Sequence, residues 1–171
     1  MAGLKIVSME KRHLDALTEL ERVCFSSPWT REGLAAELGN PGAVFFVAEL
    51  DGAAVGYAGM NCVLDECYVD NVAVFPQFRR MGVARALMSR LTAAAETRGA
   101  SFVSLEARVS NTGAVALYRG LGFEEAGRRP GFYSNPKEDA LILTKFLKQS
   151  NNSLRSGGGD AAAQDKGGQS Q

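Results

Sequence analysis

Two runs of apolar, β-forming residues flank the dipeptide Asp51-Gly52, and this arrangement restricts the fold of the chain more than any other local feature. Asp-Gly between such runs favours a two-residue turn with positive φ angles, which joins two antiparallel strands. The sequence therefore predicts a hairpin made of residues 43–50 and 53–62.

The spacing of apolar residues predicts the elements around this hairpin. Alternating or continuous apolar runs indicate strands, and apolar residues three or four positions apart indicate helices. Thr30 is the expected N-cap of the second helix. The order β-α-α-β-β-β-α-β-α-β-β predicts an α/β fold with a mixed sheet and helices on both faces. The expected strands are 4–9, 43–50, 53–62, 67–75, 101–109, 123–129 and 138–147, and the expected helices are 13–24, 30–38, 82–98 and 112–121.

The composition changes near residue 149. Residues 149–171 contain one leucine and no aromatic or β-branched residue, so they offer too little apolar surface to offset the entropy lost on ordering. The remaining residues are numerous enough to bury one core. We therefore expect one domain over residues 1–148 and a disordered tail over residues 149–171.

The charges of the chain are balanced overall but unevenly distributed. The formal net charge is zero, which argues against binding of nucleic acid through bulk charge, and no nucleic-acid partner is expected. Residues 1–70 carry 11 acidic and five basic side chains, whereas residues 71–149 carry six acidic and 12 basic ones. An anionic ligand is therefore expected to bind the second half of the chain.

The cysteines and the single histidine give no sign of a metal site. Cys24, Cys62 and Cys67 form no CxxC pair, and His13 is the only histidine, so no metal cofactor is expected. Because each cysteine lies among apolar residues, we expect reduced thiols in the core of a cytoplasmic protein. No apolar run approaches the roughly 20 residues that span a bilayer, so no membrane partner is expected.

The junction between the strand that ends near Phe75 and the helix that begins near Gly82 has the character of an anion-binding turn. Arg79, Arg80 and Arg85 surround Gly82. A helix N-terminus presents free N–H groups and a partial positive charge, and glycine lets a phosphate approach the backbone. The turn lacks both the G-K-[ST] ending of a Walker A loop and the G-x-G-x-x-G dinucleotide pattern.

The pattern R-x-x-G-x-A at Arg79, Gly82 and Ala84 follows N-V-A-V-x-P at residues 71–76. Together they resemble the pyrophosphate loop of the GNAT superfamily of N-acetyltransferases, whose fold has a mixed, mostly antiparallel sheet of about seven strands. The resemblance implies acetyl-CoA as the co-substrate, held by backbone groups of the strand and the turn. The cofactor-binding residues that it implies are Val72, Ala73, Val74, Arg79, Arg80, Met81, Gly82, Val83, Ala84 and Arg85.

Residues 105–123 are similar to the L-E-V-R-x-S-N-x-x-A-x-x-L-Y-x-x-x-G-F segment of one GNAT branch, the ribosomal-protein-alanine N-acetyltransferases. Residues 24–29 resemble the C-F-x-x-P-W loop of that branch, and residues 138–140 its E-D-A motif. By this resemblance Glu106 is the general base, Tyr118 is the general acid and Asn111 contacts the cofactor. The acceptor that it implies is the N-terminal peptide of an alanine-starting ribosomal protein.

The chemistry of acetyl transfer agrees with a carboxylate base. An amine attacks a thioester only as the free base, and the departing thiolate must take up a proton. An α-amine costs about 1 kcal/mol to deprotonate near pH 7, whereas a Lys side chain costs about 4.6 kcal/mol. A carboxylate such as Glu106 therefore suits a protein N-terminus, and His13 lies far from the motif in the sequence.

Each of these side chains also has a structural alternative. Glu106 could be a surface residue paired with Arg108, two positions along the same strand face, and Tyr118 could be a core aromatic residue. Trp29 could close the pair of N-terminal helices or contact the acceptor.

The chain departs from the pattern of the branch at two places. The paired tyrosines of the branch appear here as Phe132-Tyr133, after the insertion-like residues 129–131. Asp70 stands in the fourth expected strand, where an apolar residue is commoner. These departures leave the acceptor open. An acetyltransferase of a small amine or of other protein N-termini would share every cofactor residue, whereas a non-catalytic acyl-CoA-binding module would lack the Glu and the Tyr.

Overall fold

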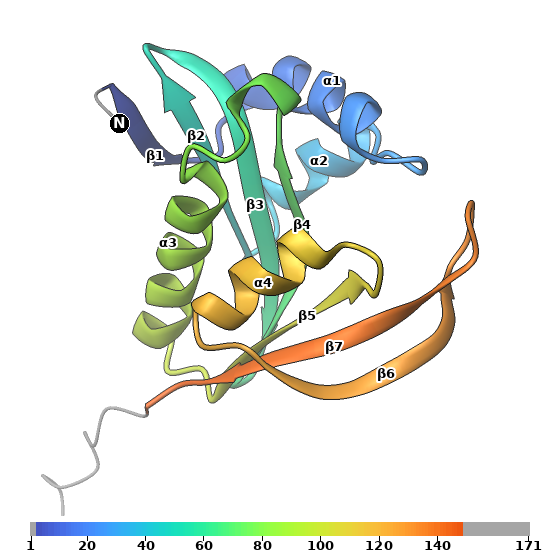
Figure 1. Ribbon diagram of the computed structural model, residues 1–171. Coiled ribbons are helices and arrows are strands. Elements are labelled where there is room, and N and C mark those ends of the chain that lie inside the picture. Colours follow the sequence, from blue (N-terminus) through green and yellow to red (C-terminus); the bar gives the residue numbers. More distant parts are fainter. Residues whose placement is uncertain (1–2, 149–171) are drawn as a thin grey trace, which may run out of the picture.

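The computed structural model describes residues 3–148, so the tail expected over residues 149–171 lies outside the described residues. The order of helices and strands is the predicted one (Figure 1). The strands are β1 Leu4–Ser8, β2 Ala43–Leu50, β3 Ala53–Val63, β4 Glu66–Val74, β5 Phe102–Arg108, β6 Glu124–Tyr133 and β7 Glu138–Phe146. The helices are α1 Leu14–Cys24, α2 Arg31–Glu37, α3 Val83–Thr97 and α4 Thr112–Gly120, with short 3₁₀ turns η1 Lys11–His13 and η2 Pro76–Phe78.

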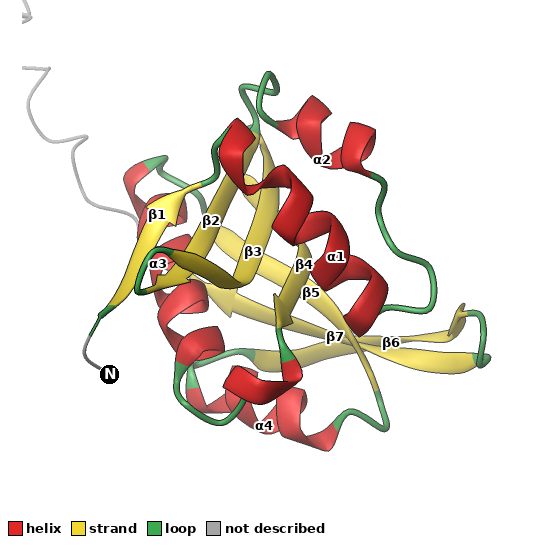
Figure 2. Cartoon of the chain, turned by 90° about the horizontal axis from the view of Figure 1, so that it is seen from above, coloured by secondary structure: helices red, strands yellow, loops and turns green. Residues whose placement is uncertain are grey.

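The described residues form a seven-stranded sheet in the order β1-β2-β3-β4-β5-β7-β6. Only β4 and β5 pair in parallel, and all other neighbours are antiparallel. Helices α1 and α2 cover one face of the sheet and α3 and α4 the other (Figure 2). This arrangement confirms the predicted fold class.

The apolar residues that predicted the helices face two separate cores. Leu14, Leu17 and Leu20 of α1 lie three residues apart and are almost fully buried against β2 and β3. Leu87 and Leu91 of α3 are four residues apart and are buried on the opposite face. The sheet therefore separates an α1–α2 core from an α3–α4 core.

Strands β4 and β5 run side by side for only three residue pairs. Their last pair is Tyr68 opposite Ser104, although β4 continues to Val74 and β5 to Arg108. In β4 a register shift places Asn71 opposite Gly59 and Val69 opposite Met60, so Asp70 is the extra residue of a β-bulge. The two strands separate beyond Tyr68, which leaves one edge of β4 without a strand partner.

Strand β6 extends four residues beyond its predicted end. Residues 129–131, which the sequence suggested as an insertion, lie within it at a shift in register between Arg129 and Tyr133. Because β6 is the outermost strand, the missing N–H of Pro130 does not interrupt pairing within the sheet. The extra length brings Tyr133 to the β6–β7 turn.

The expectation of three reduced cysteines is wrong for two of them. Cys62 and Cys67 form a disulfide and lie opposite each other in the β3–β4 pair, with their Cα atoms 4.1 Å apart. The apolar neighbours of each cysteine in the sequence carry no information on this pairing across strands. Cys24 is free and half-buried.

A buried carboxyl group joins α1 to the centre of the sheet. Glu21 is fully buried, and its carboxyl group accepts hydrogen bonds from the Tyr57 hydroxyl, from Asn71 Nδ2 at 2.8 Å and from the Trp29 backbone N–H at 3.0 Å. Burial and the neighbouring Glu21 raise the pKa of Tyr57 well above its ordinary value, so its hydroxyl keeps the proton that it donates. Glu21 thus fixes β3, β4 and the loop after α1 at one point.

Replacing Glu21 with leucine should lower the free energy of unfolding by about 3 kcal/mol, because three donors would lose their acceptor in the core. Urea denaturation measures this change. The control is the same substitution at Glu19 on the exposed side of α1, where the side chain is 60% exposed and its nearest cation, Arg22, is 3.6 Å away. That variant should differ from the wild type by less than about 0.5 kcal/mol. Equal losses in the two variants would contradict the role given to Glu21.

Candidate active site

A cavity of about 720 Å³ opens where β4 and β5 separate. Its walls come from the loop between α1 and α2, from β4 and β5, from the start of α4 and from the β6–β7 turn. Of the expected site residues, Val72, Glu106, Asn111 and Tyr118 line it. The other expected residues lie at the end of β4, in the turn before α3 and in the first turn of α3. The fold therefore brings the two proposed catalytic side chains, 12 residues apart in the sequence, to one cavity.

Glu106 lies on β5 with 29% of its side chain exposed to the cavity. Its nearest cation is Arg129 of β6, with Arg129 Nε 3.5 Å from Glu106 Oε1. The suggested pairing with Arg108 does not occur, because Arg108 pairs with Glu138 at 3.3 Å and stacks on the ring of Tyr133. The carboxylate of Glu106 thus faces the cavity, with Arg129 as its ion-pair partner.

Tyr118 lies on α4 and is 8% exposed. Its ring packs against Phe123, and the side chain reaches the cavity wall. Burial, with a smaller contribution from Tyr133, raises the pKa of Tyr118 to about 12. The hydroxyl is therefore protonated at neutral pH and can donate a proton to a group in the cavity.

The turn before α3 has the backbone that an anion site needs. Gly82 has a φ of 82° and is the N-cap of α3, and a Cβ added there would meet no atom within 4 Å. The first bond of the helix joins the Ala86 N–H to the Gly82 carbonyl, so the N–H groups of residues 83–85 point out of the helix start. Arg80 has a φ of 61°, and its side chain is exposed. Backbone donors and positive charge therefore meet in open space at this helix end.

Two of the expected cofactor residues also make contacts within the protein. Arg79 donates from Nε to the Val74 carbonyl at 3.1 Å and from Nη2 to Cys24 Sγ at 3.4 Å, which ties the turn to β4 and α1. Asn111 is the N-cap of α4, and its side-chain oxygen accepts from the Ala114 N–H at 3.2 Å. Both residues therefore hold the backbone beside the cavity in place.

Four aromatic side chains from two segments of the chain also line the cavity. Phe25 and Trp29 come from the loop after α1, and Phe132 and Tyr133 come from the end of β6. Trp29 packs against Phe45 of β2, with ring centroids 6.1 Å apart, and it also lines the cavity, so a contact with the acceptor stays a prediction.

The sequence did not identify two of the charged groups at the site. Arg129 was not recognised as the partner of Glu106, because the two residues come from strands on either side of β7. Asp70 was noticed only as an unusual residue, and the structure places it in the cavity wall. Finding Arg129 as the partner of Glu106 would have required the register of β5, β7 and β6.

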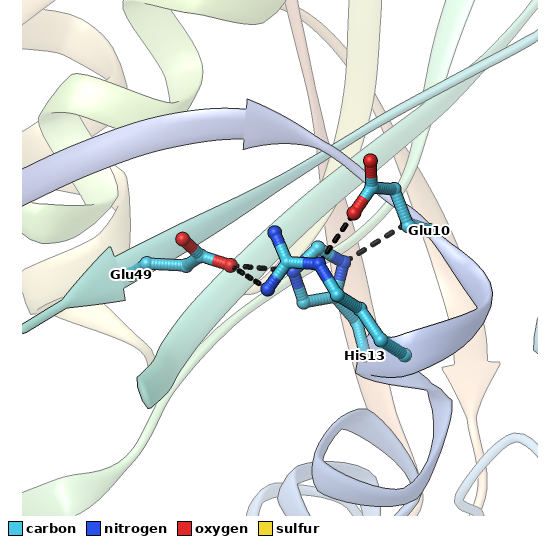
Figure 3. A network of polar contacts seen from close by, with 4 residues as sticks. Glu10, His13 and Glu49 are labelled. Carbon is cyan, nitrogen blue, oxygen red and sulfur yellow. Dashed lines mark hydrogen bonds and ion pairs between the residues drawn. The ribbon is translucent and has the colours of Figure 1, made fainter. Parts of the chain in front are cut away.

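His13 lies away from this cavity. It is buried, its Nε2 is 2.7 Å from Glu49 Oε1, and its Nδ1 accepts the Glu10 N–H at 2.9 Å (Figure 3). His13 thus joins η1 to β2.

Among residues 3–148 no group of His, Cys, Asp and Glu side chains is arranged to hold a metal ion. No helix in the described part of the chain is long and apolar enough to cross a membrane.

Comparison with known proteins identifies the family. Residues 14–123 match the Acetyltransferase (GNAT) family. The Escherichia coli K12 protein named ribosomal protein bS18-alanine N-acetyltransferase is 36% identical over 140 residues, which cover 81% of this chain and 94% of that protein. The protein of the same name from Salmonella typhimurium is 37% identical over 134 residues, which cover 76% and 88%.

A solved structure agrees with these matches. The crystal structure of the ribosomal-protein-S18-alanine N-acetyltransferase from Escherichia coli aligns with a TM-score of 0.80 and 33% identity over 88% of this chain and 98% of that one. The chain belongs to the GNAT family and is an acetyl-CoA-dependent N-acetyltransferase.

Proposed function

We propose that this enzyme transfers the acetyl group to the N-terminal α-amine of an alanine-starting ribosomal protein, the reaction named for its relatives. The observation that carries the proposal is the extent of the similarity, which spans 94% of the Escherichia coli protein and so includes more than the cofactor turn. The cavity beside Glu106 is lined by residues of the loop after α1, Phe25 to Trp29, and by Phe132 and Tyr133, the segments in which the resemblance to the relatives extends beyond the cofactor motifs. A ribosomal acceptor would place the reaction in the cytoplasm.

The proposed place of acetyl-CoA follows from the free backbone groups. The N–H groups at the start of α3 would hold the pyrophosphate, with Arg80 and Arg85 beside it. The free edge of β4 at residues 72–74 would pair with the pantetheine arm, as the absence of a β5 partner there allows. Acetyl-CoA then supplies an activated thioester at the point where β4 and β5 separate.

In the proposed reaction Glu106 accepts the proton of the attacking α-amine, directly or through a water molecule. The nitrogen forms a bond to the thioester carbon, and the carbon–sulfur bond breaks. Tyr118 donates its proton to the departing sulfur, which its raised pKa permits because the hydroxyl is protonated before the step. Glu106 and Tyr118 thus take up and supply one proton each.

The test of the acceptor compares three amines under the same conditions. These are an alanine-starting hexapeptide from a small-subunit ribosomal protein, the same peptide blocked at its N-terminus and carrying a lysine, and spermidine. The free α-amine peptide should react fastest, since the lysine costs about 3.6 kcal/mol more to deprotonate, which slows it roughly 400-fold. Faster acetylation of either competitor, measured by mass spectrometry, would refute the proposed acceptor and leave the acetyltransferase activity intact.

Replacing Glu106 with glutamine should lower kcat by about 10²–10⁴-fold, because the amide keeps the shape of the side chain but cannot accept the proton. The affinity for acetyl-CoA, measured by calorimetry, should not change. The control is the same substitution at Glu124, an exposed residue of β6, which should leave kcat unaltered. A Glu106→Gln variant that retains more than a third of the wild-type kcat would show that Glu106 is not the base.

Replacing Gly82 with alanine should weaken the binding of acetyl-CoA by about tenfold or more, because the new Cβ enters the open space in front of the helix start. Gly99→Ala is a matched control at the other end of α3. Gly99 also has a positive φ, 75°, and open space around its Cβ position, so both variants should lose similar stability through backbone strain. If calorimetry finds equal affinities of the two variants for acetyl-CoA, this turn does not bind the pyrophosphate.

A further inference from the structure

The bulge in β4 presents a carboxylate that the proposed reaction does not yet use. Asp70 has no partner residue in β3, because Val69 and Asn71 take consecutive places opposite Met60 and Gly59. Its side chain lies in the wall of the cavity that also contains Glu106. A bulge of this kind redirects a side chain that a regular strand would place elsewhere.

The contacts of Asp70 leave its charge without a counter-ion. Asn61 Nδ2 donates a hydrogen bond to Asp70 Oδ2 at 2.6 Å, and the same amide group lies 3.4 Å from Glu37 Oε2. Within residues 3–148 no Lys, Arg or His side chain forms an ion pair with Asp70. The Asn61 amide therefore serves both Asp70 and Glu37, and Glu37 also accepts a hydrogen bond from Asn40 Nδ2 at 3.2 Å.

The surroundings of Asp70 favour a cation. The side chain reaches the surface, but the protein around it withholds part of its hydration, which raises its pKa. Asn61 opposes this rise, while the charges of Glu37 and Glu106 add to it. Tyr57 of β3 also faces Asp70 but is neutral. A positive group placed between Asp70 and Glu106 would relieve the repulsion between these carboxylates.

The acceptor brings such a group. An α-amine with a pKa of about 8 is mostly an ammonium ion at pH 7, so it enters the cavity with a positive charge. We propose that Asp70 binds the α-ammonium of the incoming acceptor and holds it beside Glu106 before the proton is removed. This inference rests on the proposed acceptor. Asp70 then contributes to binding of the charged amine, and Glu106 to its conversion into the nucleophile. Glu106 passes this first proton to solvent and takes up the second N–H proton as the amide forms, while Tyr118 protonates the departing sulfur.

The separate roles of Asp70 and Glu106 predict which kinetic constant changes when Asp70 is replaced. The attacking nitrogen regains positive charge as its bond to the thioester carbon forms, so a contact with Asp70 stabilises the bound acceptor and the transition state alike. Its loss should therefore raise KM rather than lower kcat. In Asp70→Asn the KM of the alanine-starting peptide at pH 7 should rise about tenfold, the range expected for a hydrogen bond to a charged group. Its kcat should stay within about twofold of the wild-type value, and the KM of acetyl-CoA should not change.

The pH dependence separates this role from a structural one. Above about pH 9 most of the acceptor is neutral, so the KM values of Asp70→Asn and the wild type should converge there. A rise in KM that is the same at pH 7 and pH 9.5 would overturn the proposal, as would a large fall in kcat with KM unchanged. Glu66→Gln, on the exposed side of the same strand but outside the cavity, is the control and should match the wild type at both pH values.

The experiment also separates this proposal from the proposed acceptor. If the wild type acetylates spermidine or the lysine of the blocked peptide faster, the proposed acceptor is wrong, and the same KM comparison is made with the preferred amine. An unchanged KM in Asp70→Asn for the amine that the wild type does acetylate would overturn the role of Asp70 alone.

Discussion

The separation of β4 from β5 is the constraint on which the rest of the site depends. The two strands pair for three residues, end their contact at Tyr68 and Ser104, and then diverge although each continues. Their divergence exposes one edge of β4, opens the cavity and leaves Glu106 facing into it from β5. The bulge at Asp70 lies just beyond the last pair, and a bulge bends its strand and increases the local twist.

A divergent pair in the middle of a sheet needs support from both faces, and the two cores provide it. On one face Glu21 holds Asn71 of β4, Tyr57 of β3 and the backbone of Trp29 through one buried carboxyl group. On the other face α3 and α4 pack beside each other over the sheet. The proposed acceptor end therefore adjoins the α1–α2 core, and the proposed cofactor end adjoins the start of α3, so the two substrates would meet from opposite faces.

Local sequence patterns were sufficient for the elements but not for the pairing between them. Asp51-Gly52 and the apolar periodicities predicted the order of the described helices and strands and the approximate ends of all of these except β6, and Gly82 does begin α3 with a positive φ. The Cys62–Cys67 disulfide and the Glu106–Arg129 pair depend on register between strands, which no local pattern specifies. The family resemblance supplied Glu106 and Tyr118, and it could not supply the position of Asp70, where this chain departs from it.

The environments of the two proposed catalytic groups fit opposite directions of proton transfer. Tyr118 is buried on α4, and the loss of hydration keeps its proton in place at neutral pH, as a general acid requires. Glu106 is nearly one-third exposed and lies near Arg129, so a proton that it accepts has a path to solvent that does not cross the buried side of the cavity. Both side chains reach the cavity from adjacent elements of the chain, and the turn at residues 109–111 joins β5, which carries the proposed base, to α4, which carries the proposed acid. Asn111, as the N-cap of α4, holds the end of that turn, so it has a structural role besides the cofactor contact proposed for it.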